Sequence, residues 1–270
     1  MYFYLFGMEG EDKRMRDSIQ RQEAKKHFKK TNNVLLIVAI ALFVLGIGFL
    51  LIDPIRNAKR QTAVSEGLGA LESQMSAVST GNGDDTSETE EISLTLVVDA
   101  NANPVDGEEY DYFGDGEGLS VEDELASYEG SVTLNGIGII EIDSIDLRLP
   151  VWDTASVVAL RYGAGHYENS VMPGEVGNCA ILGHHMRDYG SMFNRLGEVQ
   201  SGDIIRIQTA DGNTYEYCVD SIVTIQPEDL EARIAGNYFD TARITLVTCT
   251  YSGEATLRLL VSGYLVDDQG

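Results

Sequence analysis

The sequence has few cysteines, few prolines and, over most of its length, very few basic residues. Three cysteines and five prolines occur among 270 residues. Eleven of the 19 Lys and Arg residues lie within the first 60 positions, whereas the rest of the chain holds eight arginines, no lysine and 37 of the 43 acidic residues. Nucleic-acid binding requires a basic surface, so this composition argues against it. An acidic body is typical of a soluble, exposed domain.

The three cysteines, Cys179, Cys218 and Cys249, are widely spaced, and no CxxC pair occurs. This spacing argues against a zinc cluster, and we expect neither a metal site nor a cofactor. Outside the cell, an odd number of cysteines leaves at least one free thiol. A free thiol is more consistent with a nucleophile than with a framework of disulfide bonds.

One long hydrophobic run is present, from Val34 to Ile52, and its nineteen residues carry no charge. A helix of this length nearly spans a hydrocarbon core of about 30 Å. Eight Lys and Arg residues precede the run and three follow it closely. The positive-inside rule then predicts a cytoplasmic segment over 1–33, a single-pass membrane anchor over 34–52 and an extracellular remainder. The alternative is a buried helix of a soluble domain.

The next segment, 53–135, is acidic and predicts an extracellular linker or stalk, because such a composition disfavours a packed core. Within it, helical spacing of Leu68, Leu71 and Met75 predicts a helix over 53–75, and 92–98 has the composition of a strand. Aromatic residues cluster among acids at Tyr110, Tyr112 and Phe113. This cluster is either a sticky patch in the linker or a lid over a site in the domain that follows.

From residue 136 the pattern becomes that of a globular domain, 136–270, built from short strands at close spacing. The expected strands are 137–142, 147–151, 178–184, 204–208, 214–223, 244–249 and 257–265, and short helices are expected at 155–160, 191–196 and 228–234. Asp211-Gly212-Asn213 is a hairpin turn sequence between two of these strands. The pattern predicts an all-β fold, a small closed β-barrel of about eight strands with short helices.

The strand Ile244–Cys249 ends at a thiol, and a second apolar run, Leu257–Leu265, follows after a short segment containing Gly253. Two such runs around a short loop predict a β-hairpin. If its centre falls between residues 253 and 254, Cys249 lies directly opposite Arg258. Opposite residues share a face of the sheet, so the thiol would lie beside a permanent cation that favours a thiolate or an oxyanion.

A nucleophilic cysteine also needs a base, and the chain offers four histidines: His27, His166, His184 and His185. His27 precedes the membrane run, and His166 lies in an expected loop. His184 and His185 end the strand 178–184, in which Cys179 and Ile181 are expected to point inward. The alternation of a strand then points His184 outward, on the face expected for the thiol.

The motifs around these residues resemble those of one enzyme family. Thr245-Leu246-Val247-Thr248-Cys249, followed by Arg258, resembles the TLxTC…R signature of sortases, the cysteine transpeptidases of the Gram-positive surface. Gly177-Asn178, followed by Leu182-Gly183-His184, is similar to the GN…GH element of the same family. Features of the class B, C and D members occur together, so the resemblance implies the family and not a class.

The resemblance implies a sortase-like barrel with a catalytic trio of Cys249, His184 and Arg258. Cys249 would attack the threonine carbonyl of an LPxTG-like sorting signal, His184 would transfer protons, and Arg258 would hold the substrate and the oxyanion. The partners implied are surface proteins or pilins with such a signal, and a lipid-linked cell-wall precursor or a pilin lysine as the acceptor. Thr248 and Leu246 would contact the substrate; the alternative for Thr248 is an ordinary strand residue.

Three functions remain open at this point. A membrane-anchored sortase is one, an extracellular cysteine peptidase that releases its product to water is another, and a non-enzymatic membrane-anchored binding module is the third. Both enzymes share the acyl-enzyme intermediate. Some sortases bind calcium near the loop that holds Glu228, Asp229 and Glu231, although acidic residues there also suit the start of a solvated helix.

Overall fold

The computed structural model describes residues 36–48, 58, 61–76, 94–99, 128, 130–186, 190, 192–235, 239–252 and 255–266. The chain divides into two compact units, Met1–Ile55 and Arg56–Gly270. In the first unit, residues 36–48 form a helix with exposed side chains. Among the described residues, no helix combines the length and the apolar character needed to cross a membrane. The expected anchor 34–52 extends past the described residues at both ends, and the aromatic cluster at 110–113 lies outside them.

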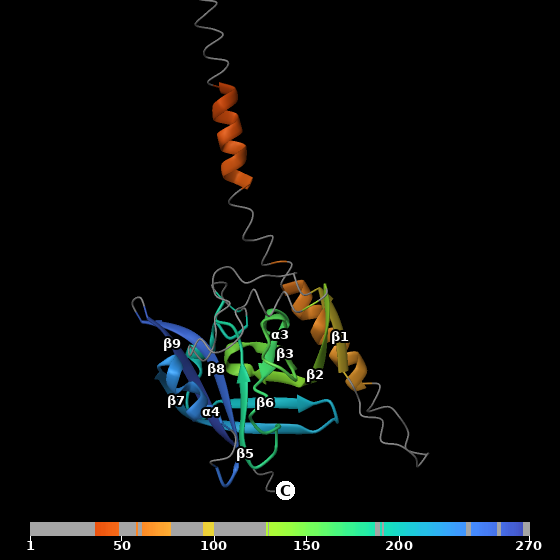
Figure 1. Ribbon diagram of the computed structural model, residues 1–270, viewed down its shortest axis with the longest axis vertical. Coiled ribbons are helices and arrows are strands. Elements are labelled where there is room, and N and C mark those ends of the chain that lie inside the picture. The colour runs from red at the N-terminus through yellow and green to blue at the C-terminus, as the bar shows by residue number, and fades with distance from the viewer. Residues whose placement is uncertain are drawn as a thin grey trace, which may run out of the picture. The chain divides into compact units, whose positions relative to one another are not determined.

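The second unit is built around a closed barrel of eight strands (Figure 1), as the sequence predicts. The strands are β1 (Leu94–Asp99), β2 (Ser131–Ile142), β3 (Leu147–Trp152), β4 (Ala164–His166), β5 (Gly177–Leu182), β6 (Ile204–Thr209), β7 (Thr214–Ile225), β8 (Ala242–Ser252) and β9 (Ala255–Leu265). The barrel order is β2-β3-β4-β5-β8-β9-β7-β6, and the pairing of β6 with β2 closes it. Closure leaves these eight strands without a long free edge.

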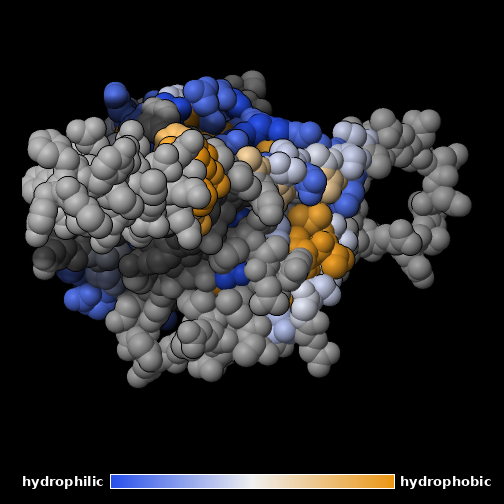
Figure 2. Space-filling view, turned by 90° about the horizontal axis from the view of Figure 1, so that it is seen from above, coloured by the Kyte–Doolittle hydropathy of each residue, from blue (hydrophilic) through white to orange (hydrophobic). Residues whose placement is uncertain are grey.

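Alternation along each strand separates an interior from an outer face. The interior of the barrel is filled by apolar side chains from all around it, including Ile140, Cys179, Ile207, Ile244 and Val261. Parallel pairing joins β3 to β4 and β5 to β8, and the other pairs are antiparallel. The short helices are α3 (Val157–Tyr162), α4 (Leu230–Ile234), η1 (Asp143–Ile145), η2 (Leu196–Glu198) and η3 (Pro227–Asp229). α3 and α4 pack on the outer face, whereas η1 and η2 add Ile145 and Leu196 to the interior cluster. The coloured surface in Figure 2 is mainly hydrophilic, with apolar residues gathered in patches.

Several local predictions are confirmed. Gln208 pairs with Thr214 across the turn at 211–213, so the expected hairpin joins β6 to β7. The helix expected at 228–234 is present as η3 followed by α4. The helix expected at 155–160 is α3, displaced by two residues towards the C-terminus.

Two local predictions are wrong. Residues 192–195 are not helical, because Met192 has a left-handed backbone (φ 50°) and pairs with His185, and the helical turn comes later, at η2. The segment around His166 is not a loop. Residues 164–166 form β4, which lies between β3 and β5. Both departures arise from backbone pairing with another segment, which propensity within the segment itself does not encode.

Part of the range expected to be a stalk is packed against the barrel. Residues 61–76 form a helix in which Leu71 and Met75 are buried, and they join a core cluster with Trp152 and Val158. β1 adds a ninth strand alongside β2. The apolar spacing predicted for this helix is therefore confirmed, and the folded structure begins well before residue 136. The boundary between stalk and catalytic domain stays a prediction.

Candidate active site

Cys249 and Arg258 lie directly opposite each other in the antiparallel pair of β8 and β9. The predicted register is confirmed, since Ser252 pairs with Ala255 at the end of the same ladder. Cβ atoms of such a pair are about 5 Å apart. Only 3% of the surface of Cys249 and 2% of that of Arg258 is exposed. Burial weakens the screening of the arginine charge by water, so a guanidinium here stabilises a thiolate or an oxyanion strongly.

His184 reaches the same place from β5, the strand on the other side of β8. The two strands run parallel with Leu182 beside Val247, and the Gly183 N–H donates to the Val247 carbonyl at 3.0 Å. If the same parallel register continues for two more residues on both segments, His184 lies beside Cys249. His184 is 4% exposed. The end of β5 and the paired strands β8 and β9 thus place the three residues named from the sequence on neighbouring strands.

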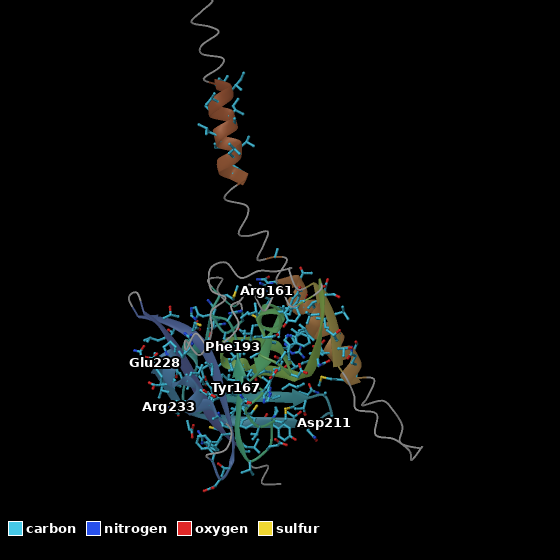
Figure 3. All side chains as sticks on the ribbon, viewed as in Figure 1. Arg161, Tyr167, Phe193, Asp211, Glu228 and Arg233 are labelled. Carbon is cyan, nitrogen blue, oxygen red and sulfur yellow. The ribbon has the colours of Figure 1, made fainter. Side chains whose placement is uncertain are left out.

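The outer face around Cys249 is apolar. Ala180, Leu182, Val247 and Leu260 share a buried cluster with Cys249, and α3 and α4 add Leu160, Leu230 and Ile234. α4 packs against β5, and Figure 3 labels Arg233 of this helix. The spacing of Leu230 and Ile234 predicts a buried helix face, but no local pattern indicates that this face borders the thiol.

Three polar residues, Asn178, Thr245 and Ser262, lie side by side on the same outer face. Thr245 precedes Cys249 by four residues on β8. The Asn178 side chain donates to the Ile234 carbonyl at 3.1 Å and accepts a hydrogen bond from the Thr245 hydroxyl at 2.8 Å. Thr245 and Ser262 are also within hydrogen-bonding distance, at 3.0 Å. These contacts tie the end of α4 to β5, β8 and β9. Asn178 therefore has a structural task in the wall of the site.

Thr248 and Leu246 lie on the opposite face of β8 from Cys249. Leu246 is fully buried in the barrel interior, where it packs in the same cluster as Ile181 and Val261. The buried hydroxyl of Thr248 donates to the Gly183 carbonyl at 2.7 Å. Substrate binding by these two residues stays a prediction, and their burial favours a supporting role.

The other described histidines have different surroundings. His166 is buried in β4, and its Nε2 lies 3.0 Å from both the Val171 carbonyl and the Ser170 hydroxyl. Burial lowers the pKa of His166, which keeps the ring neutral. His185 is half-buried and pairs with Met192. His27 lies outside the described residues.

All three cysteines are free thiols. Cys179 lies in the barrel interior, and burial raises the pKa of its thiol far above neutrality, so it is a poor nucleophile. Cys218 is half-buried on β7 opposite Tyr264. Within the described part of the chain, no three His, Cys, Asp or Glu side chains gather in a way that could hold a metal ion.

Comparison with known proteins places this region in a family. Residues 140–266 match the sortase domain model. Sortase A of Listeria monocytogenes is 35% identical over 129 residues, which are 48% of this chain and 56% of that protein. Sortase D of Bacillus subtilis is 34% identical over 138 residues, 47% of this chain and 62% of that protein. The solved structure of Listeria monocytogenes sortase A is 34% identical, with a TM-score of 0.45, over 49% of this chain and 88% of that one.

The chain thus spans somewhat more than half the length of the curated relatives it matches. The matched range contains the three residues that the fold brings together, Cys249, His184 and Arg258. It also contains α3 and α4, which supply the apolar wall. The helix at 61–76 and β1 precede the matched range.

Proposed function

We propose, from the premise that the chain belongs to the sortase family through residues 140–266, that it is a membrane-anchored cysteine transpeptidase. One observation carries the proposal. Cys249 lies opposite Arg258 on paired strands, and His184 follows the strand on the other side of Cys249. A nucleophile, a proton carrier and a fixed cation on one face are the groups that acyl transfer through a thioester requires.

In the first half-reaction, the Cys249 thiolate attacks the carbonyl carbon of the threonine in an LPxTG-like sorting signal. The new S–C bond produces a tetrahedral oxyanion, which Arg258 stabilises with its planar, permanently charged group. The C–N bond to the following glycine then breaks, and His184 gives a proton to the leaving amine. The product is a thioester on Cys249.

In the second half-reaction, an amine replaces the cysteine sulfur. His184 takes a proton from the incoming amine, the nitrogen attacks the thioester carbonyl, and the C–S bond breaks to restore the thiolate. The acceptor is an amine of a lipid-linked cell-wall precursor or a pilin lysine. The apolar wall from α3 and α4 supports this step, because a site poor in water protects the thioester from hydrolysis.

The hydrophobic run from Val34 to Ile52 serves as the membrane anchor, with the N-terminus in the cytoplasm and the catalytic domain outside. The test is protease treatment of intact, wall-stripped cells. Digestion of the domain from residue 136 onward is the expected result, with a cytoplasmic marker protein left intact as the control. Full protection of that domain would overturn the proposed topology.

The activity is tested with the full chain in detergent and a fluorogenic LPxTG-type peptide, with and without an amine acceptor. We expect peptide cleavage and, with the acceptor present, a ligated product. Cys249→Ala should abolish both, whereas Cys179→Ala removes a buried interior thiol and serves as the matched control. Cleavage to free acid alone, whatever the amine concentration, would identify a peptidase. Binding without cleavage would identify a non-enzymatic module.

A further inference from the structure

Three hydrogen bonds hold the backbone at Gly183 and His184, one on each of three consecutive peptide units. The Gly183 N–H donates to the Val247 carbonyl at 3.0 Å, and the Phe193 N–H donates to the His184 carbonyl at 3.0 Å. Between these, the Thr248 hydroxyl donates to the Gly183 carbonyl at 2.7 Å. That carbonyl belongs to the peptide unit that leads directly into His184. The Thr248 hydrogen bond therefore fixes the orientation of the Gly183–His184 peptide plane, to which the Cα atom of His184 is attached.

Gly183 needs such an external restraint. A Cβ atom at this position would lie 2.6 Å from the ring of Phe193, so the packing of Phe193 leaves room only for glycine. Phe193 is fully buried, and Figure 3 labels it within the barrel region. Glycine is the residue with the widest backbone freedom, so its conformation depends on its partners. The Thr248 hydroxyl is the side-chain partner that the structure supplies.

We infer that Thr248 is a positioning residue for His184. Its hydroxyl holds the Gly183–His184 peptide so that the imidazole stays level with Cys249, and this task rests on the proposed function of the site. Thr248 has no exposed surface and lies on the barrel side of β8, away from the thiol. A substrate that reaches Cys249 on the outer face therefore does not meet the Thr248 hydroxyl.

Three substitutions in the full chain separate positioning from other roles. Thr248→Val keeps the shape and removes the donor, whereas Thr248→Ser keeps the donor. Thr209→Val is the matched control, because the buried Thr209 hydroxyl is also a hydrogen-bond donor, to the Asp211 carboxylate at 2.5 Å with the Asn213 carbonyl 3.1 Å away. Thr209 lies at the turn that holds Asp211, which Figure 3 shows on the far side of the barrel from Arg233.

The first readout is transpeptidation of the LPxTG-type peptide. Thr248→Val should lower kcat by roughly tenfold to a hundredfold, the scale of a displaced catalytic group, with KM changed less than about twofold. Thr248→Ser should stay within about threefold of the unsubstituted chain, because a hydroxyl still reaches the carbonyl. Thr209→Val should leave kcat unchanged. Thr248→Ala, which also lacks the donor, replaces the valine variant if that variant does not fold.

The second readout is the NMR spectrum of ¹³C-labelled histidine rings, with the His184 signal assigned from His184→Gln. Thr248→Val should shift or broaden this signal, and Thr248→Ser and Thr209→Val should not. This readout does not depend on turnover, so an inactive unsubstituted chain would refute the proposed function while the positioning role is still tested. An unchanged His184 signal, a rise in KM alone, or a serine variant as impaired as valine would overturn the inference.

Discussion

Replacement of Arg258 by alanine should lower kcat/KM for peptide cleavage by about two orders of magnitude. Arg258 is directly opposite Cys249, where Cβ atoms are about 5 Å apart, and the long arginine side chain can bring its charge to a similar distance from the reacting atoms. At an effective dielectric constant of about 20, two unit charges at that distance interact by about 3 kcal/mol. Since about 1.4 kcal/mol corresponds to a factor of ten, the loss is about two orders of magnitude. Removal of an oxyanion donor costs about the same.

The assay compares Arg258→Ala and Arg258→Lys in the fluorogenic peptide assay, together with the rate at which iodoacetamide alkylates Cys249. Lysine should restore only part of the activity, because it keeps the charge and loses the planar donor pair. Arg243→Ala is the matched control, since Arg243 lies at the other end of β8 and pairs with Asp220 at 2.6 Å. Near-normal activity of Arg258→Ala, or an equal loss in the Arg243 variant, would refute the reasoning.

Three further predictions concern the histidines and the helix at 61–76. His184→Ala should abolish transpeptidation, whereas folded His185→Ala should keep substantial activity; the reverse result would overturn the strand alternation on which the assignment depends. Leu71→Ala should lower the free energy of unfolding in urea by about 2–5 kcal/mol because Leu71 is fully buried, and the exposed control Ser73→Ala should change it by less than about 0.5 kcal/mol. Burial lowers the pKa of His166, so its neutral form adds stability that is present above about pH 6.5 and is lost as the pH falls towards the folded-state pKa. His166→Gln should therefore make urea stability less dependent on pH between about 7 and 5, and an unchanged slope would contradict the burial argument.

The pairing of Cys249 with Arg258 could be predicted because a hairpin with a short loop fixes the register of every pair in its ladder. Alternation along β5 predicts His184 on the outward face, and the interior positions of Cys179 and Ile181 agree with that alternation. Closure of the barrel was predictable from the number and spacing of short strands. These features depend on local rules that act within one strand or between two consecutive strands.

Other features depend on contacts between distant segments, and the sequence patterns did not contain them. β4 is only three residues long and joins the sheet through the backbones of β3 and β5, where Gly165 permits the close approach of Thr154. Phe193 packs on Gly183, and this pairing replaces the helix expected at 191–196. The positioning role inferred for Thr248 could not be predicted from the sequence for the same reason, because its hydrogen-bond partner is 65 residues away.

The identity of the nucleophile is the central claim, and intact-protein mass spectrometry tests it most directly. The full chain is mixed with an LPxTG-type peptide without an acceptor, and the adduct is then mapped by digestion at low pH. We expect one added acyl group on Cys249, absent in Cys249→Ala, that an added amine releases as ligated peptide. An adduct on Cys218, an adduct that persists in Cys249→Ala, or cleavage without any covalent intermediate would contradict the account.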